Sequence, residues 1–115
     1  MPLVPIAAPP PPAPPPTRAL VFATEHRFSA SRRAGRFGRV IIQLRNVGED
    51  DHDLAVRGPR GRVLGSTGIV HPGRLGEVRL RLLVGRYTLF CSISDHEALG
   101  MRSVLTLRRP ARGRR

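Results

Sequence analysis

One thiol, two imidazoles and one thioether stand in this chain in an order that suits a single metal site. Cys91, His96 and Met101 follow one another with four residues between each pair, and His52 stands upstream. A soft thiolate favours Cu(I), imidazole binds either oxidation state, and a long axial thioether disturbs neither state. We therefore predict a mononuclear copper site whose ligands are His52, Cys91, His96 and Met101.

The last three of these residues lie on one expected loop between two strands. The runs 87–91 and 104–107 are rich in apolar and β-branched residues, as strands are. Cys91 therefore ends one strand, and Met101 stands just before the next. A loop that folds back between these strands can bring its thiol, imidazole and thioether to one metal ion, and Gly100 permits a tight backbone path.

His52 reaches the site from a different part of the chain. The run Val40–Arg45 is β-branched and partly alternating, so alternate apolar residues share one face of an expected strand. The polar, Gly-containing run 46–50 then gives a turn. His52 follows that turn, so we expect it at the end of the strand, beside the loop that carries the other three ligands.

Further strand and turn signals predict that the whole domain is all-β. Apolar residues largely alternate with arginine in the run Val78–Val84, which describes a strand with one buried face. Shorter strands are expected at 20–23, 28–31 and 53–56, with Gly and Pro turns between the runs. Many short strands with regularly spaced turns favour a Greek-key β-sandwich or barrel. The sequence shows no internal repeat and no long helical period.

Two motifs together resemble those of the cupredoxins, the blue copper proteins that include plastocyanin, azurin and the rusticyanin and sulfocyanin group. They are Asn-x-Gly-(x)3-His-Asp-Leu at residues 46–54 and Tyr-(x)3-Cys-(x)4-His-(x)4-Met at residues 87–101. The resemblance spans residues 20–108. It implies a Greek-key sandwich of seven or eight strands with one type 1 copper ion near one end.

The resemblance also implies a function. A protein of this group is a one-electron carrier that cycles copper between Cu(I) and Cu(II). It is not an enzyme, and it works outside the cytoplasm, in the periplasm or at the cell surface. The ring edge of His96 would be the electron port, and Ala98 and Leu99 would form an apolar rim around it. The expected partners are redox proteins, and we expect the chain to be a monomer.

One residue departs from the pattern of the group. Cupredoxins often carry Asn or Ser directly after the first ligand histidine, and this chain has Asp53. Its backbone N–H could still donate to the cysteine sulfur, whereas the amide donor of Asn is absent. Groups next to the ligands tune the potential of a metal site. We therefore expect an ionised Asp53 to favour Cu(II) and to lower the reduction potential.

Other functions remain open from the residues alone. Copper delivery or sequestration on the same fold is the main alternative, although no Met-rich or Cys-x-x-Cys motif accompanies the site. A cysteine-nucleophile enzyme would use Cys91 with His96 or His52 as its base. A nucleic-acid-binding module would need aromatic stacking platforms, and the four Phe and one Tyr form no such pattern. A dinuclear copper centre would need a second bridging cysteine, and Cys91 is the only cysteine of the sequence.

The other histidines and the tyrosine have simpler expected roles. His26 lies in an Arg-containing loop and His71 precedes a Pro-Gly turn, so we expect both at the surface and neither as a metal ligand. Tyr87 is expected to be structural, with its ring in the core and its hydroxyl bonded to nearby backbone, as in a tyrosine corner.

Composition sets off both chain ends from the domain. Residues 1–17 are Pro-rich and favour polyproline II, so we expect a disordered linker, or a tether to a membrane. Residues 18–108 form the copper-binding domain, and residues 109–115 form a basic, disordered tail. No run is long and apolar enough for a transmembrane helix, and the N-terminus does not read as an ordinary signal peptide.

The charge of the chain is strongly positive. Its formal net charge is +12 at pH 7, and every basic side chain other than histidine is arginine. Such a balance suits anionic partners, and we expect it to steer redox partners with acidic docking surfaces at low salt. GC-rich coding would give the same arginine bias without a binding role. We expect no nucleic-acid partner.

Overall fold

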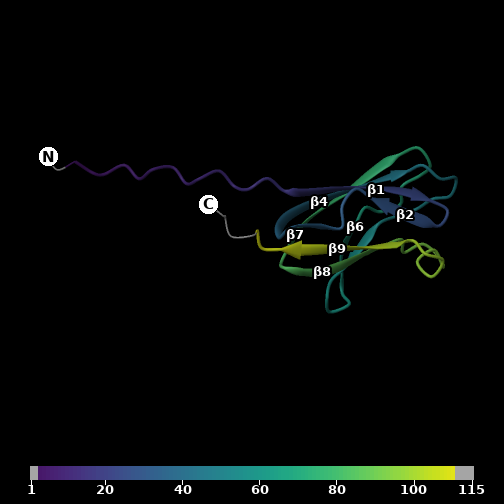
Figure 1. Ribbon diagram of the computed structural model, residues 1–115. Coiled ribbons are helices and arrows are strands. Elements are labelled where there is room, and N and C mark those ends of the chain that lie inside the picture. The colour runs from purple at the N-terminus through teal and green to yellow at the C-terminus, as the bar shows by residue number, and fades with distance from the viewer. Residues whose placement is uncertain (1–2, 111–115) are drawn as a thin grey trace.

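Nine strands and the turns between them make up residues 17–108 of the computed structural model, which describes residues 3–110. Residues 3–16 extend away from the strands as a segment without regular structure (Figure 1). No helix long and apolar enough to cross a membrane is found within residues 3–110. The strands are β1 (Thr17–Thr24), β2 (Arg27–Ala30), β3 (Ala34–Arg36), β4 (Gly38–Asn46), β5 (Ala55–Arg57), β6 (Val63–Ser66), β7 (Leu75–Leu82), β8 (Gly85–Phe90) and β9 (Arg102–Arg108).

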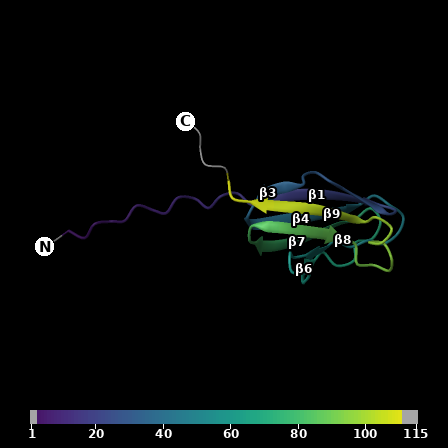
Figure 2. The same cartoon turned by 60° about the horizontal axis from the view of Figure 1, so that its bottom comes forward.

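The strands form two sheets packed as a sandwich (Figures 1 and 2). The first sheet has the order β2-β1-β4-β7, and the second has the order β3-β9-β8-β5-β6. β1 runs parallel to β4, β3 runs parallel to β9, and the remaining pairs of strands are antiparallel. The predicted all-β sandwich is confirmed.

One segment at the edge of the sandwich passes from the first sheet to the second. β2 pairs with β1, β3 pairs with β9, and only residues 31–33 separate the two strands. Thr17 fixes the crossing, because its hydroxyl accepts a hydrogen bond from the N–H of Arg36 and donates one to the carbonyl of Arg36, both at 2.9 Å. Gly35 packs so closely on Thr17 that a Cβ would clash with its side chain. Because this edge segment is divided into β2 and β3, the described residues form nine strands, where the resemblance implied seven or eight.

The core between the sheets is built mainly of aliphatic side chains. Burial alternates along the whole of β1, as the period of two requires for a strand with one face inward. Full burial of one Leu, Ile or Val side chain contributes about 1.5–3 kcal/mol. The Tyr87 hydroxyl donates to the carbonyl oxygen of Leu83 at 2.8 Å, which confirms the expected corner. The largest fully buried aliphatic side chains are Ile42, Leu44, Leu54, Leu89, Leu105 and Leu107.

The observed chain limits differ slightly from those expected. β1 begins at Thr17, which composition assigns to the linker, and this residue is buried. The folded part therefore begins one residue earlier than position 18. Of the expected basic tail 109–115, residues 111–115 lie outside the described residues.

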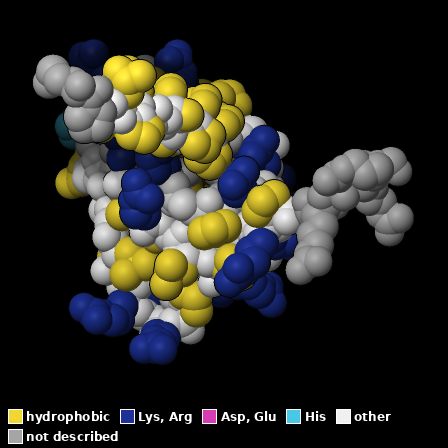
Figure 3. All heavy atoms as spheres, turned by 90° about the vertical axis from the view of Figure 1, so that its left-hand side faces the viewer, with side chains coloured by type: hydrophobic (Ala, Val, Ile, Leu, Met, Phe, Trp, Pro, Cys, Tyr) yellow, Lys and Arg dark blue, Asp and Glu magenta, His cyan; other side chains and the backbone are white. Residues whose placement is uncertain are grey.

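The sandwich has two ends of different character. The ends of β4 and β8 and the start of β9 meet at one end, together with the turn after β1 (Figure 1). We call this the ligand end, and it comprises residues 25–26, 46–54 and 91–101. The opposite end carries the base of residues 3–16 and the end of β9, and it faces the viewer in Figure 3. We call it the basic pole, and it comprises residues 36–39, 58–64, 81–86 and 108–110.

Candidate metal centre

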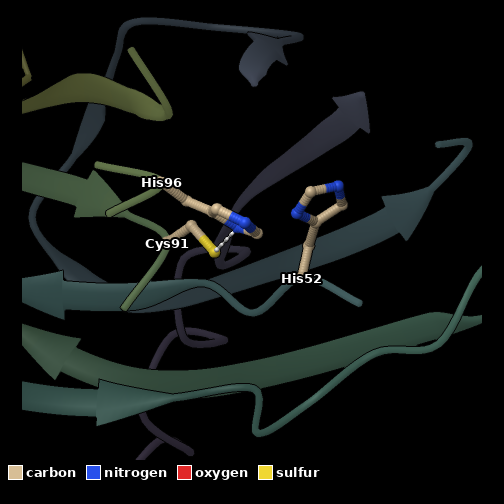
Figure 4. A group of neighbouring side chains, drawn as sticks. All are labelled: His52, Cys91 and His96. Carbon is tan, nitrogen blue, oxygen red and sulfur yellow. Dashed lines mark hydrogen bonds between the residues drawn. The ribbon is translucent and has the colours of Figure 1, made fainter. Parts of the chain in front are cut away.

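Three of the predicted ligands meet at the ligand end. One ligand atom from each of His52, Cys91 and His96 lies within 4.8 Å of the other two. The Cys91 sulfur is 3.5 Å from Nδ1 of His96 (Figure 4). All three residues are buried. The fold thus brings together an imidazole from the segment after β4 with a thiol and an imidazole from the segment after β8.

Met101, the fourth predicted ligand, is fully buried in the core at the end of the same loop. The N–H of Cys91 donates to the carbonyl of Met101 at 3.1 Å, and the N–H of Met101 donates to the carbonyl of His96 at 3.1 Å. These bonds close the loop and hold Met101 beside the other two residues. The preceding Gly100 has a φ of 122°, in the region that favours glycine.

The loop between Cys91 and Met101 is held by its own bonds and by an ion pair. Inside the loop, the N–H of His96 donates to the carbonyl of Ile93 at 3.0 Å. Outside it, the guanidinium of Arg57 on β5 lies 2.5 Å from the carboxylate of Glu97. This guanidinium also lies 4.2 Å from the ring centroid of Phe90. Because the loop is fixed at several points, its ligand groups are held in place before any metal binds.

His52 has one ring nitrogen with a partner and one without. Its backbone pairs with Val70 in an isolated bridge, and its Nε2 lies 3.2 Å from the carboxylate of Glu25. Since a carboxylate accepts, Nε2 carries the proton and Nδ1 has a free lone pair. Nδ1 is buried and has no hydrogen-bond partner. Figure 4 shows the ring beside Cys91 and His96.

A buried polar atom without a partner is costly, by about 1–3 kcal/mol. A group bound to the free lone pair of His52 would remove this cost, and a metal ion coordinated by the imidazole is such a group. Two imidazoles, a thiolate and a buried thioether are the donor set that suits copper in electron-transfer sites. The residues present at the ligand end fit a copper ion.

Glu25 contacts the predicted ligand His52, and the sequence did not single it out. Its Oε1 atom accepts hydrogen bonds from the N–H of Asp50 at 2.6 Å and of Glu49 at 2.7 Å, besides its contact with His52. These donors, the Asp50 N–H first among them, lower the pKa of Glu25 to about 2. Its carboxylate thus stays ionised and fixes the tautomer of His52, as carboxylates do behind metal-bound histidines.

Asp53 joins the two parts of the chain that carry the predicted ligands. Its N–H points at the Cys91 sulfur at 3.5 Å, and its carboxylate accepts a hydrogen bond from the N–H of Ser92 at 2.6 Å and another from the Ser92 hydroxyl. The backbone contact to sulfur agrees with the expectation from the sequence. The carboxylate also links the two chain segments, because it binds Ser92, the residue after the predicted thiol ligand, to Asp53, the residue after a predicted imidazole ligand.

Burial makes Cys91 a poor nucleophile in the metal-free protein. Burial is the main cause that raises the pKa of its thiol, while N–H donors from Asp53 and Ile93 act in the opposite direction. A catalytic cysteine needs a lowered pKa and access to substrate. The structure therefore favours metal binding over the cysteine-nucleophile alternative.

The two remaining histidines differ in their burial and their neighbours. His71 is exposed, as expected, and its Nδ1 lies 2.8 Å from a carboxylate oxygen of Asp51. His26 is less exposed than expected, and its ring centroid lies 4.6 Å from that of His96. His26 is half-buried, and with Asp50 and His96 it forms a second group of close ligand atoms. Its position depends on the turn between β1 and β2, for which the sequence carried no signal.

Solved structures with the same arrangement of strands identify the fold. The chain matches a dithionite-reduced auracyanin from Roseiflexus castenholzii with a TM-score of 0.66, covering 84% of this chain and 99% of that one at 16% identity. It matches auracyanin B with a TM-score of 0.68, covering 84% and 92% at 17% identity. The chain has the cupredoxin fold. Auracyanin A, described as a blue copper protein from Chloroflexus aurantiacus, matches with a TM-score of 0.65, covering 82% and 100% at 14% identity.

Sequence comparisons add nothing to this assignment. Neither a family model nor a curated protein sequence matches the chain. Identities of 14–17% show a shared fold and leave the function to be argued from the site.

Proposed function

We propose that this cupredoxin-fold protein binds one type 1 copper ion and carries single electrons between redox proteins outside the cytoplasm. The proposed ligands are His52, Cys91, His96 and Met101. The observation that carries the proposal is the buried Nδ1 atom of His52, which has no hydrogen-bond partner and belongs to a ring packed beside a thiol and a second imidazole. The auracyanins of the same fold include one described as a blue copper protein, which supports the choice of metal.

Side chains around the proposed ligands would keep the ligand positions nearly the same in both oxidation states. Bound copper would supply the Cu(I)/Cu(II) couple. Glu25 holds the tautomer of His52, and Asp53 holds the Cys91 loop to the His52 segment. Because these contacts do not involve the metal, the ligand positions persist whichever charge the metal carries. A small structural change between the two states makes electron transfer fast.

The ligand set also argues against catalysis at this site. Catalytic metal sites keep an open position for water or substrate. Here four protein ligands would fill the coordination sphere, and all four residues are buried. An electron needs no such opening, because it can leave through the His96 ring, which at 8% is the most exposed of the four residues. We therefore propose that the chain is a carrier and not an enzyme.

Voltammetry of the copper-loaded chain tests the proposal. A carrier gives one reversible one-electron wave, and repeated cycles leave copper bound. His71→Ala serves as a control, because His71 is exposed and its ring pairs with Asp51. His52→Ala should abolish the wave, and the control should leave it unchanged. Tight Cu(I) binding without a reversible wave would instead indicate copper sequestration or delivery.

A further inference from the structure

Charged side chains are separated along the sandwich. Seven of the eight acidic residues lie on or beside the ligand loops, and the remaining one, Glu77, lies on β7. The basic pole contains no acidic residue, and every arginine there is exposed. Figure 3 shows arginine and hydrophobic side chains on this face and no acidic ones. The arginines of the basic pole are Arg36, Arg39, Arg60, Arg62, Arg81, Arg86, Arg108 and Arg109.

Apolar side chains project among these arginines. Leu83 and Val84 form the turn that joins β7 to β8, and they are 78% and 49% exposed. They line a hollow of about 450 Å³ together with Leu64, and two of the arginines, Arg60 and Arg62, border the same hollow. Exposed aliphatic residues surrounded by cationic ones form a surface that is apolar at its centre and positive around it.

The segment 3–16 joins the sandwich at the same pole. The guanidinium of Arg39 donates to the carbonyl of Pro14 at 2.9 Å, which holds the base of this segment against the pole. The segment bears further exposed apolar side chains at Leu3, Val4 and Ile6. Only the base of the segment contacts the pole, and the segment then extends away from the sandwich, so Leu3, Val4 and Ile6 lie far from the pole itself (Figure 1).

We propose that the basic pole docks on the surface of an anionic lipid bilayer. Its arginines would bind lipid phosphates, for which the planar guanidinium is well suited. Leu83 and Val84 would enter the headgroup region, where apolar side chains gain free energy by burial. Each basic side chain close to an anionic bilayer strengthens the attraction, so the arginines of the pole act together.

Lipid fits this surface better than nucleic acid does. A single-strand binder presents aromatic rings on which bases stack, and the side chains that project at the pole are aliphatic. Docking through the pole would leave the ligand end at the far side of the sandwich, facing away from the bilayer. If the proposed electron transfer is correct, the His96 end is then free to meet a redox partner. The docking itself does not depend on copper.

Vesicle flotation of the full metal-free chain tests the docking. The probes are phosphatidylcholine vesicles with and without phosphatidylglycerol, at low and high salt. We expect binding to the anionic vesicles only, and weaker binding at high salt. The double variant Arg60→Glu/Arg62→Glu should lower the partition coefficient by about tenfold or more. Leu83→Ser/Val84→Ser should lower it too, although the charge is unchanged.

A matched pair beside the ligand end is the control. Arg45 and Arg74 are exposed, and the carbonyl of Arg74 accepts from the N–H of Asn46, next to Arg45. Arg45→Glu/Arg74→Glu changes the net charge by the same amount as the variant at the pole. It should reduce vesicle binding far less, and thermal unfolding curves confirm that each variant is folded.

Three outcomes would overturn the docking proposal. The first is equal loss of binding in the pole variant and the control, which would indicate attraction by net charge alone. The second is no binding of the wild type to anionic vesicles. The third is unchanged vesicle binding in the pole variant together with reduced binding to DNA, which would assign the surface to nucleic acid. None of these results bears on copper binding, so the two proposals fail separately.

Discussion

Replacement of Glu25 by Gln isolates the effect of one negative charge behind His52. The amide oxygen of Gln can occupy the place of Oε1 and accept the same three hydrogen bonds, from Glu49, Asp50 and His52. The variant therefore changes the charge and little of the shape. We expect it to fold and to be less stable at neutral pH.

The shift in the Glu25 pKa sets the size of this effect. A fall from 4.5 to about 2 corresponds to about 3 kcal/mol in favour of the ionised form, at about 1.4 kcal/mol for each pKa unit. The side chain is 31% exposed, so solvent screens part of this energy. We expect Glu25→Gln to lower the free energy of unfolding by about 1–2 kcal/mol at pH 7.

The effect should depend on pH with a definite sign. The folded-state pKa lies below the unfolded value, so ionised Glu25 stabilises the fold fully above pH 4.5, and this contribution is lost as the pH falls toward 2. Urea unfolding of the metal-free wild type and variant at several pH values measures it. Equal stabilities at pH 7, or a difference that does not shrink below pH 4.5, would refute the reasoning.

Three further substitutions have expected outcomes. Asp53→Asn removes the charge beside the Cys91 sulfur, so the reduction potential of the copper-loaded protein should rise in voltammetry, and an unchanged or lower value would contradict this. Tyr87→Phe deletes the bond to the Leu83 carbonyl and should cost about 1 kcal/mol in urea unfolding; no measurable cost would show that the bond is replaced by water. Gly76→Ala places a Cβ about 2.5 Å from a methyl carbon of the buried Val70 and should lower the free energy of unfolding by about 1–3 kcal/mol. A neutral result would mean that Val70, which pairs with the backbone of His52, moves freely.

The sequence predicted the parts of the site that depend on short separations. Cys91, His96 and Met101 lie on one loop, so their spacing and the flanking strand patterns sufficed. The position of His52 could also be predicted, because a strand and a turn lead directly to it. The all-β class followed from alternation and turn residues, since these patterns reflect the geometry of each strand and not the arrangement of the sheets.

The contacts that were missed depend on pairing between distant strands. Glu25 meets His52 because β1 runs parallel to β4, with Ala23 opposite Asn46, and this brings the turn after β1 beside the segment after β4. No local sequence pattern predicts that β1 pairs with β4. The same turn places His26 against the His96 ring. The separation of charge between the two ends has a similar cause, because it depends on which loops the topology gathers at each end.

The most direct test of the central claim is a titration of the metal-free chain with Cu(II), followed by visible absorption. The proposed site predicts saturation at one equivalent of copper and an intense band from the Cu(II)–thiolate bond. Cys91→Ser should remove the band, whereas Ser92→Ala, one residue along, should retain it. A wild-type protein that stays colourless with copper, or a Cys91→Ser variant that keeps the band, would contradict the proposed site.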